Sequence, residues 1–347
     1  MFERVRPRNL EDFEEPRMVP LGGHLFGACF FLMKLLPARF MLKRAVERGQ
    51  LAPGGTICES SSGTFALALA MLSVLNGYRL LIVGDWALDR NLRRRLLQLG
   101  AELDIVEEPH PIGGFQLARL ERLQEHLRRR PGSYWPAQYY NEDNPISYSK
   151  VAACFIDAVG PIDCLVGTVG SGGSMCGTAR YLRMLFPDLT VIGVDTHNSV
   201  LFGQPNAPRK VSGLGGGIVP ANVDHTQFDE IHWLPASEIM ASAHDLHGRH
   251  GLFMGPTSGA AFRVARWWSD CNPGKTVVAI FPDEGHRYAD TVYDEAWLES
   301  SIPGWNGTRM EEPTAVSSPT VDMTSWAKYT WRRRNLSDVL GDLPPRI

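Results

Sequence analysis

The sequence predicts an α/β protein made of two lobes, each with a mostly parallel sheet. Short apolar segments alternate with longer helical patterns along most of the chain, as in repeated strand–helix–strand units. The apolar segments are nearly continuous, as expected of strands that helices cover on both faces. An aromatic and proline-bearing segment at residues 133–145 interrupts the alternation, which is typical of a loop between two lobes.

The composition indicates a large folded protein and argues against some classes of binding protein. The chain has 347 residues, of which 44% are hydrophobic and 21% charged, so it can form two sizeable cores. Its net charge of −3 argues against a general binder of nucleic acids or membrane surfaces. Only six of the 35 Lys and Arg residues are lysines, which leaves few lysines available for chemistry.

The cysteines and the N-terminal segment bear on where the protein works. The six cysteines form no CxxC pair and have no regular spacing, which favours reduced thiols over a disulfide framework or a metal site. Residues 1–16 are charged and lack the apolar core of a signal peptide. The apolar run at residues 25–33 is about half as long as a membrane span. We therefore expect a soluble, cytoplasmic protein.

The smaller lobe is expected over residues 34–144, after a leader at residues 1–33 that packs on the larger lobe. Its first helix, over residues 35–48, has Pro37 in the first turn and Gly49 just past the end, where these residues are favoured. Strands are predicted at residues 56–60, 79–85 and 102–108, and helices at residues 65–75, 88–100 and 115–129.

The larger lobe is expected over residues 145–300, where the alternation resumes. Strands are predicted at residues 163–170, 189–196 and 277–285, and helices at residues 146–159, 175–186 and 260–268. Beyond residue 300 the apolar content falls, which indicates an extended tail over residues 301–347. We expect at most a short helix there, near residues 326–334.

A segment that we call the glycine loop, GSGGS at residues 170–174, lies between a predicted strand and a predicted helix. Glycines allow a ligand close to the backbone, and the N-terminus of a helix offers free N–H groups and partial positive charge. Ser171 and Ser174 add hydroxyl donors. The loop therefore predicts a phosphate site, and the alternative is an ordinary strand-to-helix turn.

A second segment, which we call the serine loop, is SSSGT at residues 60–64. It also follows a predicted strand and begins a predicted helix. Its hydroxyl and N–H groups would lie at the carboxyl end of a parallel strand, where open α/β sheets bind ligands. Such neutral donors suit a carboxylate, and the alternative is a group of serines that cap the helix.

Lys34 differs from the other lysines because its neighbours at residues 30–33 and 35–37 are apolar. Apolar surroundings favour the neutral amine, lower its pKa and give a nucleophile that can form a Schiff base. The alternative is a lysine on a core helix whose amine reaches out to solvent.

Three further segments could complete a site. The glycine-rich residues 213–217 predict a permissive loop that forms a wall or a hinge. Residues 255–261, GPTSGAA, place hydroxyls at the start of a helix. Asp283 and Arg287 follow a buried strand and could close a site, and the alternative is a surface salt bridge between them.

In this order, the segments resemble the cysteine synthase/cystathionine β-synthase family of pyridoxal phosphate (PLP) enzymes, from about Lys34 to Leu298. ESSSGTFALALAM resembles the family's substrate loop, GSGGSMCGTARYL its phosphate loop, and GPTSGAA the segment whose hydroxyl meets the pyridine nitrogen. QYYNEDN, GLGGGIVP and FPDEGHRYADT resemble three more of its motifs. The resemblance implies a homodimer of fold type II, with two three-layer α/β/α lobes and PLP between them.

The resemblance also implies roles for individual residues. Lys34, counted back from Arg48 and Gly49, takes the place of the lysine that binds PLP through a Schiff base and moves the α-proton. The residues matched to cofactor binding are Gly170, Ser171, Gly172, Gly173, Ser174, Thr257 and Thr64. Those matched to binding the substrate carboxylate are Ser61, Ser62, Gly63 and Gln138.

One branch of the family is particularly similar. VEEPHPIGGFQLARLERLQ, SYWPAQY and RYADTVYDEAWL resemble enzymes that join O-phospho-L-serine to L-glutamate in 2,3-diaminopropionate-type siderophore biosynthesis. This implies a β-replacement through an aminoacrylate, with small amino acids as the partners. A departing phosphate needs a cation, and Arg119 is the candidate, with Tyr139 as a phenolic neighbour. The alternative for Arg119 is a solvated helix arginine.

The chain departs from the family just before the lysine. The family has asparagine-proline-x-glycine-serine there, whereas residues 28–33 are ACFFLM, and Thr64 replaces an asparagine that meets the cofactor's ring oxygen. These departures leave a non-catalytic relative with a binding or regulatory role as one alternative. A cysteine synthase, with sulfide as the nucleophile, is the other, because the same core residues would serve both reactions.

Overall fold

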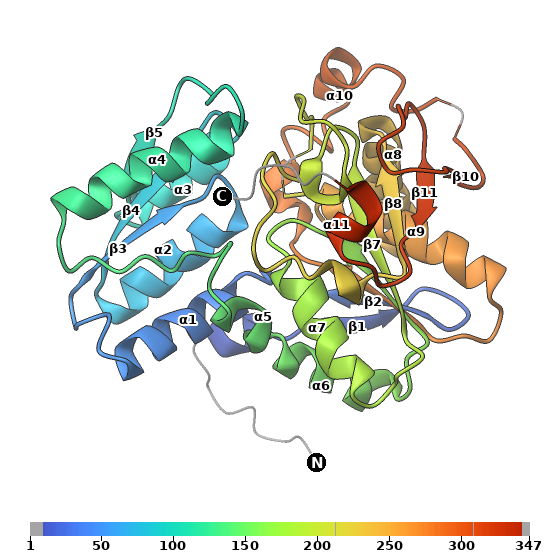
Figure 1. Ribbon diagram of the computed structural model, residues 1–347, viewed down its shortest axis with the longest axis horizontal. Coiled ribbons are helices and arrows are strands. Elements are labelled where there is room, and N and C mark those ends of the chain that lie inside the picture. The colour runs from blue at the N-terminus through green and yellow to red at the C-terminus, as the bar shows by residue number, and fades with distance from the viewer. Residues whose placement is uncertain (1–9, 212, 308, 342–347) are drawn as a thin grey trace.

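The computed structural model describes residues 10–211, 213–307 and 309–341, and it has two lobes, each with its own sheet (Figure 1). The smaller sheet has three parallel strands, in the order β3 (Thr56–Ser60), β4 (Arg79–Gly84) and β5 (Glu102–Ile105). Four helices surround it: α1 (Leu35–Glu47), α2 (Thr64–Asn76), α3 (Arg90–Gln98) and α4 (Gly114–Arg129).

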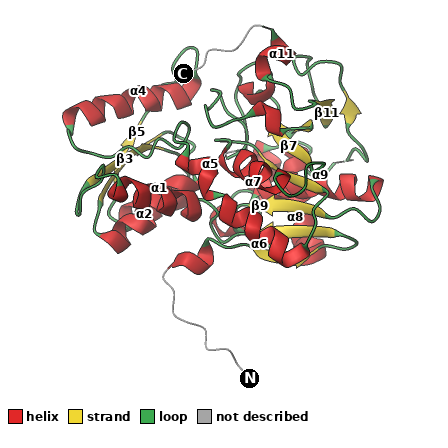
Figure 2. Cartoon of the chain, turned by 60° about the horizontal axis from the view of Figure 1, so that its bottom comes forward, coloured by secondary structure: helices red, strands yellow, loops and turns green. Residues whose placement is uncertain are grey.

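The side chains of β4 show why this lobe has three layers. Leu80 and Ile82 pack into one core with residues of α1, α2 and α3, whereas Leu81 and Val83 pack into another core on the side of α4. Successive residues of a strand face opposite sides, so a continuous apolar strand needs a helical layer on each side. Figure 2 shows α4 on one side of β3 and β5, and α1 and α2 on the other.

The larger sheet has eight strands in the order β1-β2-β9-β6-β7-β8-β11-β10. The neighbouring pairs from β2 to β8 are parallel, while β1–β2 and β8–β11 are antiparallel. The strands are β1 (Arg17–Pro20), β2 (Leu25–Cys29), β6 (Cys164–Thr168), β7 (Thr190–Thr196), β8 (Glu230–Leu234), β9 (Val277–Phe281), β10 (Thr314–Ala315) and β11 (Ala327–Thr330).

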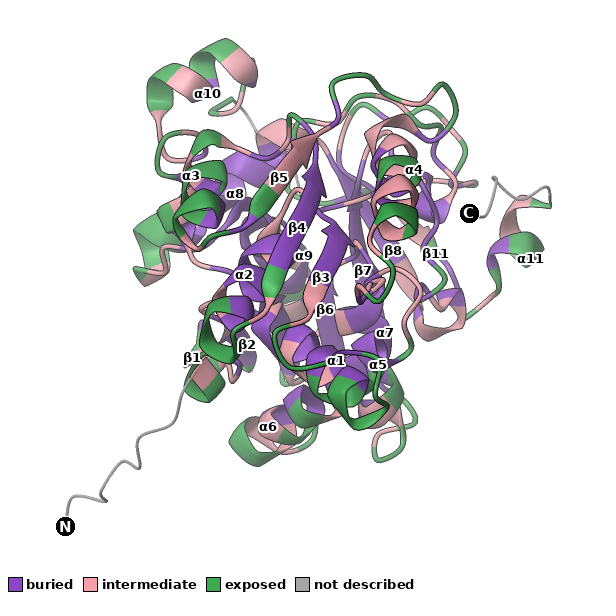
Figure 3. Cartoon of the chain, turned by 90° about the vertical axis from the view of Figure 1, so that its left-hand side faces the viewer, coloured by how far each residue is buried: buried purple, intermediate pink, exposed green. Residues whose placement is uncertain are grey.

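Helices cover both faces of the larger sheet. Leu165 and Val191 pack on the side of α6 and α7, whereas Val166 and Ile192 pack on the side of α8 and α9. In Figure 3 the inner strands, such as β4 and β6, are largely buried, whereas β5 at the edge of the smaller sheet is not, and the exposed residues lie on outward helices and in loops. The remaining helices are α5 (Asp143–Ser147), α6 (Ser149–Val159), α7 (Gly173–Arg183), α8 (Ala236–His250), α9 (Pro256–Cys271), α10 (Glu295–Ser301) and α11 (Leu336–Leu340), with short 3-10 turns at Leu10–Phe13, Val200–Phe202, His225–Gln227 and Gly285–Tyr288.

This architecture confirms the predicted fold class of two three-layer lobes with mostly parallel sheets. Residues 17–29 of the expected leader form the hairpin β1–β2, and β2 pairs with β9 of the larger sheet. The boundaries proposed at residues 33/34, 144/145 and 300/301 stay predictions. Within the described ranges, no helix combines the length and apolar character that crossing a bilayer requires.

The short helix expected near residues 326–334 is wrong. Residues 327–330 form β11, which pairs antiparallel with β8, and Trp326 and Trp331 at its two ends are buried. Pairing with β8 gives this segment backbone partners and buries its two large rings, which outweighs the helical tendency of its charged residues. The expected extended tail is therefore joined to the larger sheet by its backbone.

Candidate active site

A cavity of about 770 Å³ is lined by residues of both lobes. Its walls include residues that follow β3, β4, β6 and β9, which are the carboxyl ends of parallel strands, where α/β proteins usually bind ligands. The residues predicted from the sequence that line it are Lys34, Ser61, Ser62, Gly63, Thr64, Arg119, Gln138, Tyr139, Gly170, Ser171, Ser174 and Thr257. Gly172 and Gly173 do not line it.

Lys34 lies at the start of α1 with its amine in the cavity. Its Nζ donates a hydrogen bond to the Ser171 hydroxyl at 3.2 Å, so the first helix of the smaller lobe meets the glycine loop of the larger lobe. Burial lowers the pKa of Lys34 to about 8. The amine faces the cavity and not bulk solvent, which argues against the alternative of a solvent-reaching lysine.

The glycine loop joins β6 to α7 and presents only part of itself to the cavity. Gly170, Ser171 and Ser174 line the cavity, at the N-terminal end of α7. Gly172 has φ +85°, and a Cβ there would collide with the Asn222 carbonyl. A Cβ on Gly173 would collide with the side chain of Asn144. These two glycines are therefore required by packing inside the protein, and their contact with a cofactor stays a prediction.

The serine loop joins β3 to α2, and its residues Ser61 to Thr64 line the cavity, whereas Ser60 is buried and does not line it. The N-cap of α2 is Gly63, and no side chain caps this helix, so the capping alternative is wrong. Gln138 lies beside the loop, where its side-chain amide donates to the Ser60 carbonyl at 3.2 Å. Ser61, Ser62 and Gln138 thus reach the cavity together, as the prediction of a carboxylate site requires.

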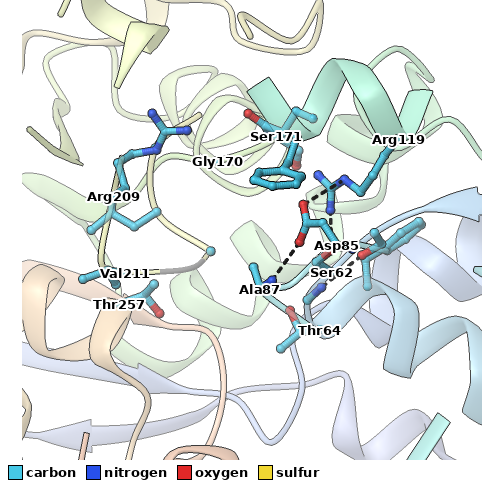
Figure 4. Close-up of a pocket in the computed structure, with 18 of the residues that line it drawn as sticks. Ser62, Thr64, Asp85, Ala87, Arg119, Gly170, Ser171, Arg209, Val211 and Thr257 are labelled. Atoms are coloured by element: carbon cyan, nitrogen blue, oxygen red, sulfur yellow. Dashed lines mark hydrogen bonds and ion pairs between the residues drawn. The ribbon is translucent and has the colours of Figure 1, made fainter. Parts of the chain in front are cut away.

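Arg119 is buried, with 4% of its surface exposed, so the alternative of a solvated helix arginine is wrong. Its Nη1 donates to the Ser62 hydroxyl at 2.6 Å, and its Nε lies 3.4 Å from a carboxylate oxygen of Asp85 (Figure 4). The Asp85 backbone N–H also donates to the Ser62 hydroxyl, at 3.0 Å. The serine loop, Asp85 and Arg119 therefore form one buried polar group on the wall of the cavity.

The sequence analysis missed Asp85 and Glu59. Asp85 directly follows a buried strand, at the sheet edge where ligands bind, and this position could have identified it as a site residue. The buried Glu59 carboxylate accepts from the backbone N–H groups of Ser60 at 2.8 Å and Gln138 at 3.3 Å, and from the Trp135 indole at 3.2 Å. Burial raises the pKa of Glu59 to about 7. No local signal distinguished this glutamate from other strand carboxylates.

Asp283 and Arg287 both line the cavity, and the alternative of a surface salt bridge between them is wrong. Arg287 pairs with Asp89 of the smaller lobe at 2.7 Å, with its side chain 8% exposed. The buried Asp283 accepts from the Tyr288 hydroxyl at 2.7 Å, and burial raises the pKa of Asp283 to about 6. Arg287 therefore links the two lobes at the cavity.

Comparison with known proteins agrees with this geometry. A family described as pyridoxal-phosphate dependent enzyme matches residues 33–283. The chain is 33% identical over 291 residues to N-(2-amino-2-carboxyethyl)-L-glutamate synthase from Cupriavidus metallidurans, covering 82% of this chain and 84% of that protein. It is 34% identical over 267 residues to the protein of the same name from Ralstonia nicotianae, covering 76% and 78%. A cysteine synthase structure from Entamoeba histolytica matches with a TM-score of 0.76 at 24% identity, over 87% of this chain and 97% of that chain, which shows the fold.

The residues that line the cavity fit PLP. Lys34 offers an amine of lowered pKa for the cofactor's aldehyde, and the N-terminus of α7 offers N–H groups beside Gly170 and Ser171 for its phosphate. The buried Thr257 hydroxyl makes no hydrogen bond within the described part of the chain, so it is free to meet a ring nitrogen. The chain therefore belongs to the pyridoxal-phosphate dependent enzymes, with the fold type II architecture of the cysteine synthases and PLP as its cofactor.

Proposed function

We propose that this enzyme catalyses a β-replacement that joins O-phospho-L-serine to L-glutamate with release of phosphate. The names of the relatives at 33% and 34% identity support L-glutamate as the acceptor. The observation that carries it is Arg119, a buried cation that lines the cavity and binds Ser62 of the serine loop. Acetate, the leaving group of O-acetyl-L-serine, departs with less negative charge than phosphate, so such a cation matters less for a cysteine synthase that uses this donor.

Lys34 is the proposed catalytic residue. When bound, PLP supplies an electron sink that makes the α-proton of an amino acid acidic. With a pKa of about 8, a useful fraction of the Lys34 amine is neutral near neutral pH. That amine can hold the cofactor covalently, and once the substrate displaces it, it can accept the α-proton. The Ser171 hydroxyl, 3.2 Å from Nζ, orients it.

The donor substrate is proposed to bind through its carboxylate to the serine loop and Gln138. Ser61, Ser62 and Gly63 line the cavity at the beginning of α2, where the backbone N–H groups of the first turn have no partner within the helix. Thr64 and Thr257 are proposed cofactor contacts, since both line the cavity and are uncharged. The proposed contact of Gly172 and Gly173 with the cofactor phosphate has no support from the cavity lining.

Arg119 is proposed to receive the departing phosphate. Its Nη1 bonds Ser62 and its Nε faces Asp85, whereas its Nη2 makes no hydrogen bond within the described residues. That group is therefore available to a substrate, and a charge-assisted bond from arginine to a phosphate is strong. Tyr139, which also lines the cavity, is the proposed neighbour of the phosphate.

The changed segment before Lys34 still holds the lysine in place. The Phe30 backbone N–H donates to the Phe281 carbonyl at 2.9 Å, and the Met33 N–H donates to the Pro282 carbonyl at 2.8 Å. Backbone bonds of this kind do not depend on the side chains that differ from the family pattern. This supports a catalytic role over the non-catalytic alternative.

Purified enzyme loaded with PLP tests the proposal. We expect phosphate release from O-phospho-L-serine that depends on L-glutamate, with lower rates when O-acetyl-L-serine replaces the donor or sulfide replaces L-glutamate. Faster turnover with O-acetyl-L-serine and sulfide would instead identify a cysteine synthase. No turnover and no change in the cofactor's absorbance with either donor would support the non-catalytic alternative.

We also propose that the enzyme works as a cytoplasmic homodimer in siderophore biosynthesis. The family resemblance supports the dimer, as do two adjacent exposed apolar residues after α7, Met184 at 74% and Leu185 at 62% exposure. All six cysteines are free, which suits a reducing compartment. Sedimentation velocity tests the dimer, and we expect Met184→Glu to shift it toward the monomer.

A further inference from the structure

The charges that line the cavity are not all balanced. Five cationic side chains and three carboxylates line it: Lys34, Arg119, Arg209, Lys210 and Arg287, and Asp85, Asp89 and Asp283. Arg119 faces Asp85 and Arg287 pairs with Asp89. Among the residues that the structure describes, Lys34, Arg209 and Lys210 form no ion pair, and Lys34 is already proposed to hold the cofactor. We call Arg209 and Lys210 the 209–210 pair, and they carry the unbalanced positive charge of the cavity.

Neutral acceptors hold Arg209 in place. Its Nη1 donates to the Asn198 carbonyl, to the Asn206 side-chain oxygen at 3.0 Å and to the Ala207 carbonyl at 3.2 Å. These bonds fix the guanidinium with neutral partners. The buried Asp195 acts on Arg209 through space, but the two form no ion pair, and burial raises the pKa of Asp195 to about 7, which favours its neutral form. Lys210 is exposed and offers a second cation beside Arg209.

The 209–210 pair lies on the large-lobe side of the cavity. Figure 4 shows Arg209 across the cavity from Arg119, Asp85 and Ser62. The neighbouring Asn206 donates to the Ile112 carbonyl of the smaller lobe at 3.4 Å, so this loop lies where the lobes meet at the rim of the cavity. The cavity therefore has two cationic ends. At one end Arg119 is in contact with the Asp85 carboxylate, whereas the carboxylate that acts on Arg209, that of Asp195, does not line the cavity.

We propose that the 209–210 pair binds the side-chain carboxylate of the amino acid nucleophile and thereby selects an acidic amino acid over a neutral one. This rests on the proposed function, in which the donor's phosphate lies at Arg119. The nucleophile arrives after that phosphate has left, and it enters past the exposed Lys210. Arg209 supplies a planar, permanently charged donor pair that suits a carboxylate.

The test compares L-glutamate with its uncharged isostere L-glutamine as nucleophile, with O-phospho-L-serine as donor and the PLP-loaded enzyme. We expect Lys210→Met to raise the KM for L-glutamate about tenfold, as the loss of one charge-assisted bond would. The KM for L-glutamine and the KM for O-phospho-L-serine should not change. Arg209→Lys should have a smaller effect than Arg209→Met, because it keeps the charge. If Arg209→Met does not fold, Lys210→Met and Arg209→Lys decide the question.

Lys43→Met is the matched control, because Lys43 lies on the outer face of α1 with its side chain 73% exposed. An equal rise in KM for L-glutamate and L-glutamine, or no rise for either, would overturn the inference. A rise only for O-phospho-L-serine would assign the pair to the donor's phosphate and overturn it too.

A failure of the proposed function can be distinguished from a failure of this inference by the absorbance of the bound cofactor. If the proposed function fails, O-phospho-L-serine alone would not change that absorbance in the unmodified enzyme. Calorimetric titration with L-glutamate and with L-glutamine would still test the 209–210 pair. We expect weaker binding of L-glutamate to Lys210→Met, and equal binding of L-glutamate to both proteins would overturn the inference.

Discussion

The serine loop and the glycine loop both connect a buried strand to a helix at the cavity, but different interactions fix their conformations. In the serine loop, side chains form the contacts: the Ser62 hydroxyl accepts from Arg119 and from the Asp85 backbone, and Glu59 accepts from the Ser60 N–H. Its glycine, Gly63, has extended backbone angles, and an added Cβ would meet no atom within 4 Å.

The glycine loop is held by close backbone packing instead. Gly172 is left-handed at φ +85°, and a Cβ on Gly172 or Gly173 would collide with Asn222 or Asn144. Two loops of similar composition therefore tolerate change differently. Replacing polar side chains should disturb the serine loop, whereas adding a side chain at Gly172 or Gly173 should disturb the glycine loop.

The largest effect is expected at Lys34, whose amine touches the glycine loop at Ser171. Lys34→Ala removes the proposed site of covalent attachment, so borohydride reduction should leave no PLP on the protein. The measurement is the mass of the reduced, digested peptide that contains residue 34. Lys43→Ala is the control and should keep full labelling. Labelling at Lys43 in the Lys34→Ala protein would contradict the assignment.

The next largest effect is a difference in stability between glycine variants of the two loops. Gly172→Val places a β-branched residue at positive φ against Asn222, so it should lower the free energy of unfolding by about 3 kcal/mol or more. Gly63→Ala should change it by less than about 0.5 kcal/mol, because the space is open. Urea denaturation of the protein without cofactor measures both. Equal losses would show that the loops are held in the same way.

This comparison also changes how the phosphate site should be tested. Gly172→Val would disturb the fold whether or not the loop binds phosphate. Gly170 lines the cavity, and a Cβ there would lie 3.4 Å from the Gly213 carbonyl. Gly170→Ala is therefore the sharper substitution, and we expect it to weaken PLP binding with little loss of stability.

Arg119→Ala tests the side-chain chemistry of the serine loop. Loss of a charge-assisted bond worth about 1.5–3 kcal/mol should lower the rate with O-phospho-L-serine about ten- to a hundredfold. The rate with O-acetyl-L-serine should fall much less, since acetate leaves with less charge. The ratio of the two rates is the measurement, because the loss of the ion pair with Asp85 affects both donors alike. Arg122→Ala, 47% exposed on the same helix, is the control, and an equal loss with both donors would make Arg119 structural.

The sequence predicted the parts of the fold whose pattern is local. The continuous apolar strand at residues 79–84 and the apolar helix at residues 64–76 need burial on all sides, and both were predicted within a few residues. The strand at residues 327–330 was not predicted, because its partner β8 lies about a hundred residues away and its own pattern is charged.

The residues of the site also fall into those that the local sequence predicted and those that only the fold brings together. Lys34 and the two loops were predicted because an apolar setting and a hydroxyl-rich turn are visible in the sequence, and the family resemblance gave their order. Arg209 and Lys210 lie in a loop without a motif, and only the meeting of the two lobes brings them to the cavity. Gly172 and Gly173 were assigned to a ligand, whereas their neighbours Asn222 and Asn144 are distant in sequence and could not be foreseen.

At neutral pH and constant conditions the least visible effect is expected at Glu59, which holds the serine loop to Gln138 and whose contribution shows only as a change in pH dependence. Burial raises the pKa of its carboxyl from 4.5 to about 7, so the folded protein binds more protons than the unfolded chain between these values. The stability that Glu59 contributes is therefore present below pH 4.5 and is lost as the pH rises toward 7. Glu59→Gln cannot ionise, so the fall in unfolding free energy between about pH 5 and about pH 7.5 should become smaller by about 2 kcal/mol. Urea denaturation at the two pH values measures it, with Glu121→Gln, at a side chain 59% exposed, as the control. An unchanged pH dependence would mean that Glu59 is ionised in the folded protein and that the three donors around it outweigh its burial.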